Sequence, residues 1–211
     1  MHTVPNVDEY DDPVRYLRAM HAAILERVGV LEVHANESSS ARESIAELLT
    51  FFGRTLPIHE RDEEESLFPV LIEKSHRVGF QPVDPEFEFL HRDHDRLNAQ
   101  NRELFEQLES EESSDTWRLS AATFAANIRE HIANEDRLVY ANANDRLSPE
   151  ERIAIMQALK QRHQRSVAMP SFQFDQPTSS MPIGLSFADP ADAVADQWTD
   201  SDDESDDDDD E

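Results

Sequence analysis

The sequence contains no cysteine, only two lysines and only four glycines among its 211 residues. Without cysteine the chain cannot form disulfides, thiolate zinc sites or iron–sulfur clusters. The scarcity of glycine, together with long stretches free of proline, favours helices over a fold of many short strands. No apolar run approaches the ~20 residues that a membrane-spanning helix needs. The first residues show neither the basic nor the apolar region of a secretion signal.

Positive charge is also scarce, and the formal net charge is −27. A nucleic-acid surface or an anionic membrane surface needs a basic patch, so both partners are excluded. An acidic, lysine-poor composition is typical of proteins in a cytoplasm with molar salt, where charge repulsion is screened over ~3 Å. We therefore expect a cytoplasmic protein of an extreme halophile.

The negative charge is unevenly distributed along the chain. No lysine or arginine follows Arg165, and residues 166–211 carry 14 acidic residues. The preceding 165 residues hold 32 acids and 19 bases, which gives −13 against −14 for the shorter segment. We predict one domain over residues 1–165 and a disordered acidic tail over 166–211, whose few aromatic residues could dock a protein partner.

The domain reads as a series of helices. Asp12 and Pro13 form an N-cap and first helical position, and Ser148-Pro149-Glu150-Glu151 has the order of a capping box. With the intervening breaks at polar and proline-containing stretches, the expected helices cover 13 to about 33, about 86–109, about 115–144 and 149 to about 163. A further helix is expected to follow a serine cap in the break ANESSSARES and to run to about Ser75.

Apolar residues recur at three- and four-residue spacing on each of the first four helices, which marks the face that a bundle buries. Each stripe is interrupted near its middle by histidine, twice followed by glutamate four residues later. The stripes are Val14, Leu17, His21, Ile24, Val28; Ile45, Leu48, Phe52, Leu56, His59, Glu63, Leu67, Val70; Phe87, Leu90, His94, Leu97, Asn101, Leu104, Leu108; and Trp117, Ala121, Phe124, Ile128, His131, Glu135, Leu138.

The polar interruptions repeat along the chain. His21 and His94 are 73 residues apart, and His59 and Glu63 recur 72 residues later as His131 and Glu135. Two helical hairpins related by an approximate twofold axis would bring these four histidines and two glutamates to one level of a four-helix bundle.

One histidine on an apolar face is usually a satisfied core residue, but six buried polar groups at one level demand another explanation. Each unpartnered group costs ~1–3 kcal/mol, against a total stability of ~5–15 kcal/mol. A bound cation removes this cost. Imidazoles and carboxylates without thiolates suit iron or manganese, with zinc possible, and a carboxylate can bridge two ions. His91 and Glu60 are possible additional ligands, since each lies close to the stripe.

These motifs resemble the hemerythrin-like (HHE cation-binding) family, which has single histidines on the first and third helices and H-x-x-x-E-E-x-x-L-F-P on the second. Residues 59–69, HERDEEESLFP, match that motif at every defined position. The third-helix element is Asp93-His94-Asp95-Arg96-Leu97. The fourth, HIANEDRLVYA, keeps His131 and Glu135 but has Asp136 for the second Glu and Val-Tyr-Ala for Leu-Phe-Pro.

The resemblance covers about residues 13–163 and implies an up-down-up-down bundle with a carboxylate-bridged centre of two non-haem irons. It implies His21, His59, His94 and His131 as terminal ligands and Glu63 and Glu135 as bridges. Oxygen-carrying members have a fifth histidine four residues before the third-helix ligand, where this chain has Leu90. This departure favours iron binding, O₂ or NO sensing, or slow redox turnover over reversible O₂ carriage. The preferred function is binding of O₂ or a related diatomic in sensing, storage or a stress response.

Two alternatives stay open. A di-iron redox enzyme of oxidase, peroxidase or ferroxidase type would use the same ligands. A ferritin-like site needs paired Glu-x-x-His motifs, and Glu88 to His91 has that spacing but lies outside the inner stripe of its helix. An interaction protein would instead act through its acidic tail. A binding or sensing protein is the preferred reading over an enzyme.

Overall fold

A computed structural model describes residues 4–36, 42–77, 84–110 and 114–168 of the chain, and within these residues it contains helices and no β-strand. The predicted breaks near residues 37–41, 78–83 and 111–113, and most of the predicted tail, lie outside the described residues. The elements are a 3₁₀ turn η1 (Val7–Glu9), α-helices α1 (Pro13–Asn36), α2 (Arg42–Asp62), α3 (Phe68–Arg77), α4 (Asp84–Glu109), α5 (Ser114–Glu135), α6 (Ala141–Arg146) and α7 (Pro149–Ala168), and π-helical segments η2 (Glu63–Leu67) and η3 (Asp136–Tyr140).

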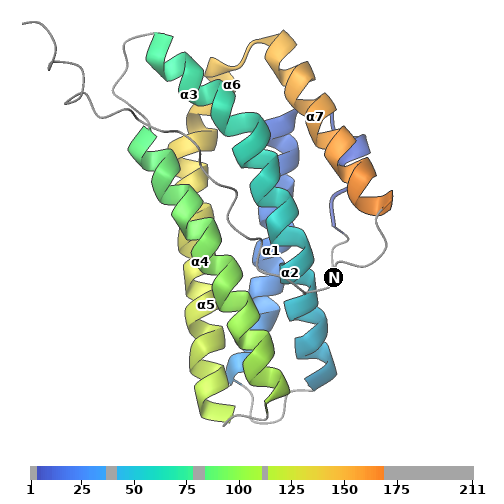
Figure 1. Ribbon diagram of the computed structural model, residues 1–211, viewed down its shortest axis with the longest axis vertical. Coiled ribbons are helices and arrows are strands. Elements are labelled where there is room, and N and C mark those ends of the chain that lie inside the picture. The colour runs from blue at the N-terminus through green and yellow to red at the C-terminus, as the bar shows by residue number, and fades with distance from the viewer. Residues whose placement is uncertain (1–3, 37–41, 78–83, 111–113, 169–211) are drawn as a thin grey trace, which may run out of the picture. The chain divides into compact units, whose positions relative to one another are not determined.

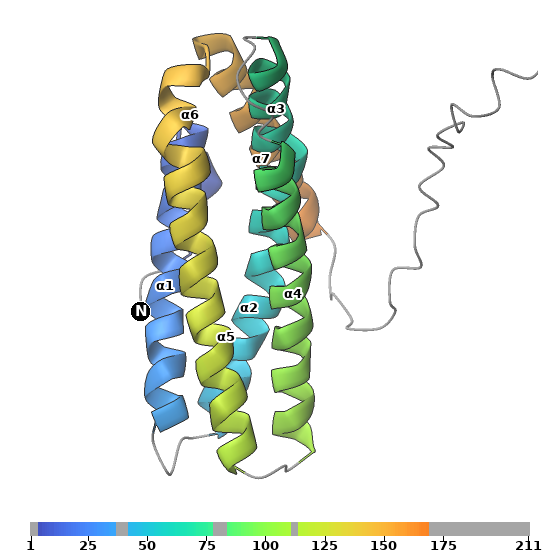
Figure 2. The same ribbon diagram turned by 90° about the vertical axis from the view of Figure 1, so that its left-hand side faces the viewer.

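Four long helices form the bundle that the sequence predicts. α1 packs against α2 and α5, and α4 packs against the same two helices, which closes an antiparallel ring of four (Figures 1 and 2). α3 continues α2 beyond η2, and α6 continues α5 beyond η3. α7 covers the outside of α1 and α2. The predicted all-α bundle of four long helices with a shorter fifth helix is thereby confirmed.

Local hydrogen bonds explain where these helices begin. The Asp12 carboxylate accepts from the Arg15 backbone N–H at 2.8 Å, which makes Asp12 the N-cap of α1. Ser148 and Glu151 form the predicted capping box: the Ser148 N–H donates to the Glu151 carboxylate at 2.7 Å, and the Glu151 N–H donates to Ser148 Oγ at 3.3 Å. Pro85 lies in the first turn of α4, where its missing N–H loses no intrahelical bond.

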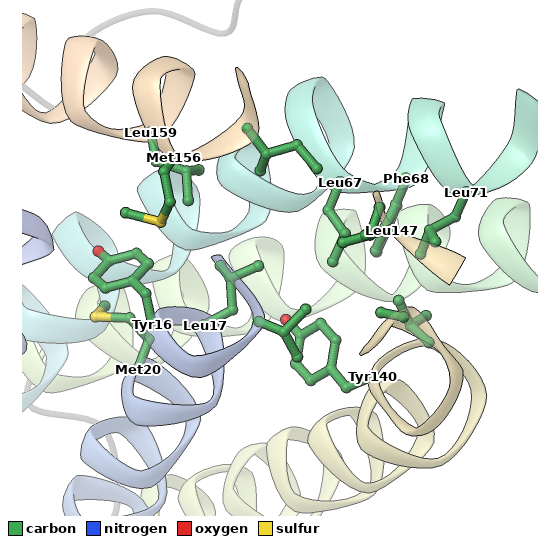
Figure 3. Close-up of a cluster of buried hydrophobic side chains, with 14 of the residues drawn as sticks. Tyr16, Leu17, Met20, Leu67, Phe68, Leu71, Tyr140, Leu147, Met156 and Leu159 are labelled. Carbon is green, nitrogen blue, oxygen red and sulfur yellow. The ribbon is translucent and has the colours of Figure 1, made fainter. Parts of the chain in front are cut away.

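The apolar core has two parts. One part joins η1, the starts of α1 and α4, α3, α6, α7 and the ends of both π segments. Figure 3 labels ten of its residues, including Tyr16, Leu67 and Tyr140. The other part joins the second half of α1 to α2, α4 and α5. On α1 and α4 the predicted histidine lies between residues of one part and residues of the other. Along the other two helices the change from one part to the other comes at Glu63 and at Glu135. The polar level therefore divides the core.

The two π-helical segments change the buried face after each glutamate. In η2 the Phe68 N–H donates to the Glu63 carbonyl, five residues back, so one turn contains an additional residue. The sequence stripe predicts Val70 as the next buried position after Leu67, but Leu71 is buried and Val70 is only partly so. The stripe likewise predicts burial of Leu138, which is only partly buried. These two predictions were wrong because they assumed 3.6 residues per turn throughout.

Candidate metal centre

Six side chains from five helical segments meet at the level between the two core parts. All six are buried. They are His21 from α1, His59 from α2, Glu63 from η2, His94 from α4, and His131 and Glu135 from α5. The structure thus brings together every residue that the sequence repeat predicts, although metal binding by them stays a prediction.

Each glutamate presents one oxygen to each pair of histidines. Glu135 Oε2 lies 3.1 Å from His21 Nε2, while its Oε1 lies 3.2 Å from His94 Nε2 and 3.0 Å from His131 Nε2. Glu63 Oε1 lies 3.5 Å from His59 Nε2, and its Oε2 lies 3.6 Å from His94 Nε2. Two carboxylates between two pairs of imidazoles are arranged as a bridged pair of metal sites requires.

The donors form two clusters whose ligand atoms lie within 4.8 Å of one another. The first contains His21, His59, Glu63 and Glu135; the second contains His94, His131 and Glu135. Several of these buried atoms have no hydrogen-bond partner, among them both ring nitrogens of His59, His21 Nε2 and one oxygen of each glutamate. A buried polar atom without a hydrogen-bond partner lowers the stability of the fold by ~1–3 kcal/mol, and a bound cation would offset that loss. The donor set fits a metal centre.

The pKa values show how the side chains share protons when no metal ion competes. Burial lowers the pKa of each histidine, but nearby carboxylates more than offset this effect at three of them. Asp136 and Glu135 raise the pKa of His21 to about 9. Glu135 and Glu64 raise the pKa of His94 to about 11, and the pKa of His131 is raised to about 9. Burial and the charge of Glu135 raise the pKa of Glu63 well above its usual value. Metal ions would therefore replace protons at this site.

Residues 12–143 match the family described as the hemerythrin HHE cation binding domain. The chain belongs to this family. A relative in Haemophilus influenzae, described only as an uncharacterized protein, is 23% identical over 137 residues, which are 61% of this chain and 77% of that protein. No solved structure matches the chain. Within the described residues, none of the helices is long and apolar enough to cross a membrane.

Around the candidate ligands of this hemerythrin-like chain, a second layer of acids faces the other ring nitrogens. Glu64 Oε1 lies 2.6 Å from His94 Nδ1, Asp136 Oδ1 lies 3.3 Å from His21 Nδ1, and Asp93 Oδ2 lies 3.6 Å from His131 Nδ1. Such partners fix the tautomer and orientation of a metal-binding imidazole. Glu64 and Asp136 occupy equivalent places after Glu63 and Glu135, and each reaches across to the single histidine of the other hairpin.

Glu64 does not belong to the apolar stripe that the sequence predicts, yet it is partly buried against His94. The reason is that the π turn starts at Glu63, so the ~100° step of an α-helix no longer locates the next side chain. The internal repeat is the sequence feature that could have identified Glu64 as a neighbour of the centre, because an acid follows the predicted ligand in both copies: Glu64 after Glu63 and Asp136 after Glu135.

Two aromatic rings at equivalent positions cover the centre. The Phe68 ring lies parallel to His94, with 6.4 Å between centroids, and the Tyr140 ring lies 5.0 Å from that of His21. The buried Tyr140 hydroxyl also donates a hydrogen bond to Glu63 Oε1. The sequence signal for this contact is the tyrosine of Val-Tyr-Ala where the family motif has phenylalanine.

The two additional ligands suggested by the sequence lie beside the centre. Glu60 is buried and accepts a hydrogen bond from Asn98 at 2.6 Å. His91 is exposed, and its Nδ1 lies 2.6 Å from Glu64 Oε1. Neither belongs to the two clusters that contain Glu135.

Proposed function

We propose that the chain is a non-haem di-iron protein that binds O₂ or a related diatomic such as NO, in sensing, storage or a stress response. The observation that supports this most strongly is the orientation of Glu63 and Glu135, each with one oxygen toward each histidine pair. His21 and His59 would hold one ion, His94 and His131 the other. Imidazole and carboxylate donors without thiolates suit iron, and bound iron would supply open coordination positions and redox chemistry.

The protein's own side chains fit a small ligand. The centre is enclosed by the two core parts, so water access is restricted and the bound molecule must be small. Leu90, at the place of the fifth histidine of oxygen carriers, is fully buried in the apolar core and offers no donor. This favours sensing or a stress response over reversible O₂ carriage.

One observation favours a di-iron redox enzyme as the second candidate. The Tyr140 hydroxyl contacts Glu63 inside the buried centre and can hold a proton there. A proton donor at this place would assist turnover more than simple ligand binding.

The amino-acid composition indicates the cellular environment in which either function would take place. The net charge of −27 and the presence of only two lysines fit a haloarchaeal-type member of the family working in a cytoplasm of high salt.

The deciding experiment is the metal content and visible spectrum of the anaerobically reduced protein before and after O₂. About two irons per chain and a visible band that appears with O₂ and disappears on its removal would support ligand binding. Prompt irreversible oxidation would favour the redox enzyme. A folded protein that takes up no iron after iron-replete expression would contradict both.

A further inference from the structure

The two single histidines of the bundle have different neighbours at their solvent-facing sides. Arg18 precedes His21 by three residues, and His91 precedes His94 by three, so the two positions are equivalent in the repeat. Arg18 Nε lies 3.9 Å from Asp136, the acid that faces His21. His91 Nδ1 lies 2.6 Å from Glu64, the acid that faces His94. The same position therefore carries a fixed cation on one side and a possible metal ligand on the other.

On the His91 side, three side chains lead from solvent to the centre. The exposed fraction falls from 60% for the His91 side chain to 25% for Glu64 and 3% for His94. Glu64 Oε1 contacts Nδ1 of both rings at 2.6 Å, and the three residues offer donor atoms within 4.8 Å of one another. The opposite nitrogen of His94 faces Glu135 inside the centre.

Charge also distinguishes the two sides. The guanidinium of Arg18 neutralises Asp136 and repels a cation. Beside Glu64, by contrast, the buried carboxyl of Glu60 has one oxygen without a hydrogen-bond partner. A cation would be attracted to this side of the bundle.

We propose that Glu64 and His91 form a solvent-facing site for a divalent transition metal ion, through which the ion enters the centre past His94. The inference rests on the proposed di-metal function. An imidazole and a carboxylate suit Fe²⁺, Mn²⁺, Co²⁺ or Zn²⁺. Two protein donors hold an ion more weakly than the donor sets of the centre, which allows the ion to move inward. The opposite side, with Arg18, does not serve this purpose.

Co²⁺ uptake by the metal-free full chain tests the entry route. In 1 M KCl, which screens the remaining acids, the visible bands of Co²⁺ at the centre should appear about tenfold more slowly in His91→Ala and in His91→Arg than in the parent, because the surface site loses one of its two protein donors. The final band intensity should be unchanged, because His91 contributes no atom to the centre. Arg18→Gln is the matched control and should keep the parent rate within about twofold.

Unchanged uptake rates in both His91 variants would overturn the proposal, as would an equal slowing by Arg18→Gln. A second measurement keeps the inference independent of the centre. At about 0.1 equivalent of Mn²⁺, the ring signals of His91 in the NMR spectrum should broaden before those of His163. If His91 broadens first but the centre takes up no metal, the proposed function fails and the surface site stands. If the centre fills and His91 does not broaden, the surface site alone is refuted.

Discussion

At the scale of single residues, Glu63 and Glu65 show how differently two acids of one charged run are placed. Glu63 is fully buried between histidines, whereas the Glu65 side chain is 57% exposed and 3.0 Å from Arg162. Glu63→Gln should lower iron affinity by more than the about 10–100-fold typical of changes around a ligand. Glu65→Gln should leave it unchanged. Iron per chain after dialysis against graded chelator measures both, and similar losses in the two variants would refute the assignment of the inner face.

Tyr140 offers a prediction on stability. Tyr140→Phe removes the hydroxyl that donates to Glu63 Oε1 and keeps the aromatic ring. The variant then has phenylalanine at this position, as the chain has at the equivalent position Phe68. A buried acceptor without its partner costs about 1–3 kcal/mol, so the free energy of unfolding of the metal-free protein should fall by that amount. Urea unfolding measures it, with Tyr10→Phe, outside the centre, as control. No loss relative to that control would mean that Glu63 does not depend on the hydroxyl.

The raised pKa values predict that metal binding depends steeply on pH. His21, His94 and His131, with pKa values of about 9, 11 and 9, carry protons at pH 7, and a metal ion can bind only after displacing them. The competition weakens as pH rises toward these values, so affinity should increase with pH between 6 and 8 and protons should be released. Zn²⁺ calorimetry in buffers of different ionisation enthalpy measures the release. Proton-independent binding would contradict the proton sharing described above.

At the scale of elements, the α-helical parts were predictable and the π-helical parts were not. The 3.6-residue period located all six candidate ligands, because His59 precedes the first π segment, Glu63 is the first residue of that segment, and Glu135 precedes the second. Beyond those points the period changes, which is why Glu64, Leu71 and Val139 escaped prediction.

Proline does not explain the π segments. Pro69 follows η2, but Ala141 occupies the equivalent place after η3. Both π segments begin at or directly after the glutamate of a His-x-x-x-Glu motif. We therefore associate the π turn with the candidate metal centre. A single sequence carries no marker for it, because both segments are made of ordinary helix-forming residues.

Helix α7 is attached to α2 by a buried charge. Asp62 is fully buried next to Glu63, and it pairs with Arg162 at 2.5 Å and with His163 at 2.8 Å. Sequence reasoning had assigned no role to His163. Removing one partner of a buried ion pair costs about 3–5 kcal/mol. Loss of Arg162 should lie at the low end of that range, because His163 would remain as a partner of Asp62.

Arg162→Gln should therefore lower the free energy of unfolding by about 3 kcal/mol. The exposed Arg165 on the same helix is the control, and Arg165→Gln should change stability by less than about 0.5 kcal/mol. Denaturant unfolding compares the two variants. Equal, small effects would show that α7 is held by its apolar contacts, which include Met156 and Leu159 (Figure 3).

At the scale of the whole molecule, the dominant feature is charge. Residues 166–211 contribute −14 of the net −27, and the rest of the chain contributes −13. Repulsion among exposed charges acts over about 10 Å at 0.1 M salt and about 3 Å at 1 M. The free energy of unfolding should consequently rise as KCl increases from 0.1 to 2 M, beyond the general effect of salt on apolar burial.

Truncation after Ala168 tests how that charge relates to the metal centre. It removes 14 acids and leaves every candidate ligand in place, so iron content and the response to O₂ should match those of the full chain. The stability gained between 0.1 and 2 M KCl should become smaller, because about half of the net charge is gone. Loss of iron on truncation would mean that the acidic segment takes part in metal binding. Intact metal chemistry with lost cellular function would instead support an interaction role for this segment.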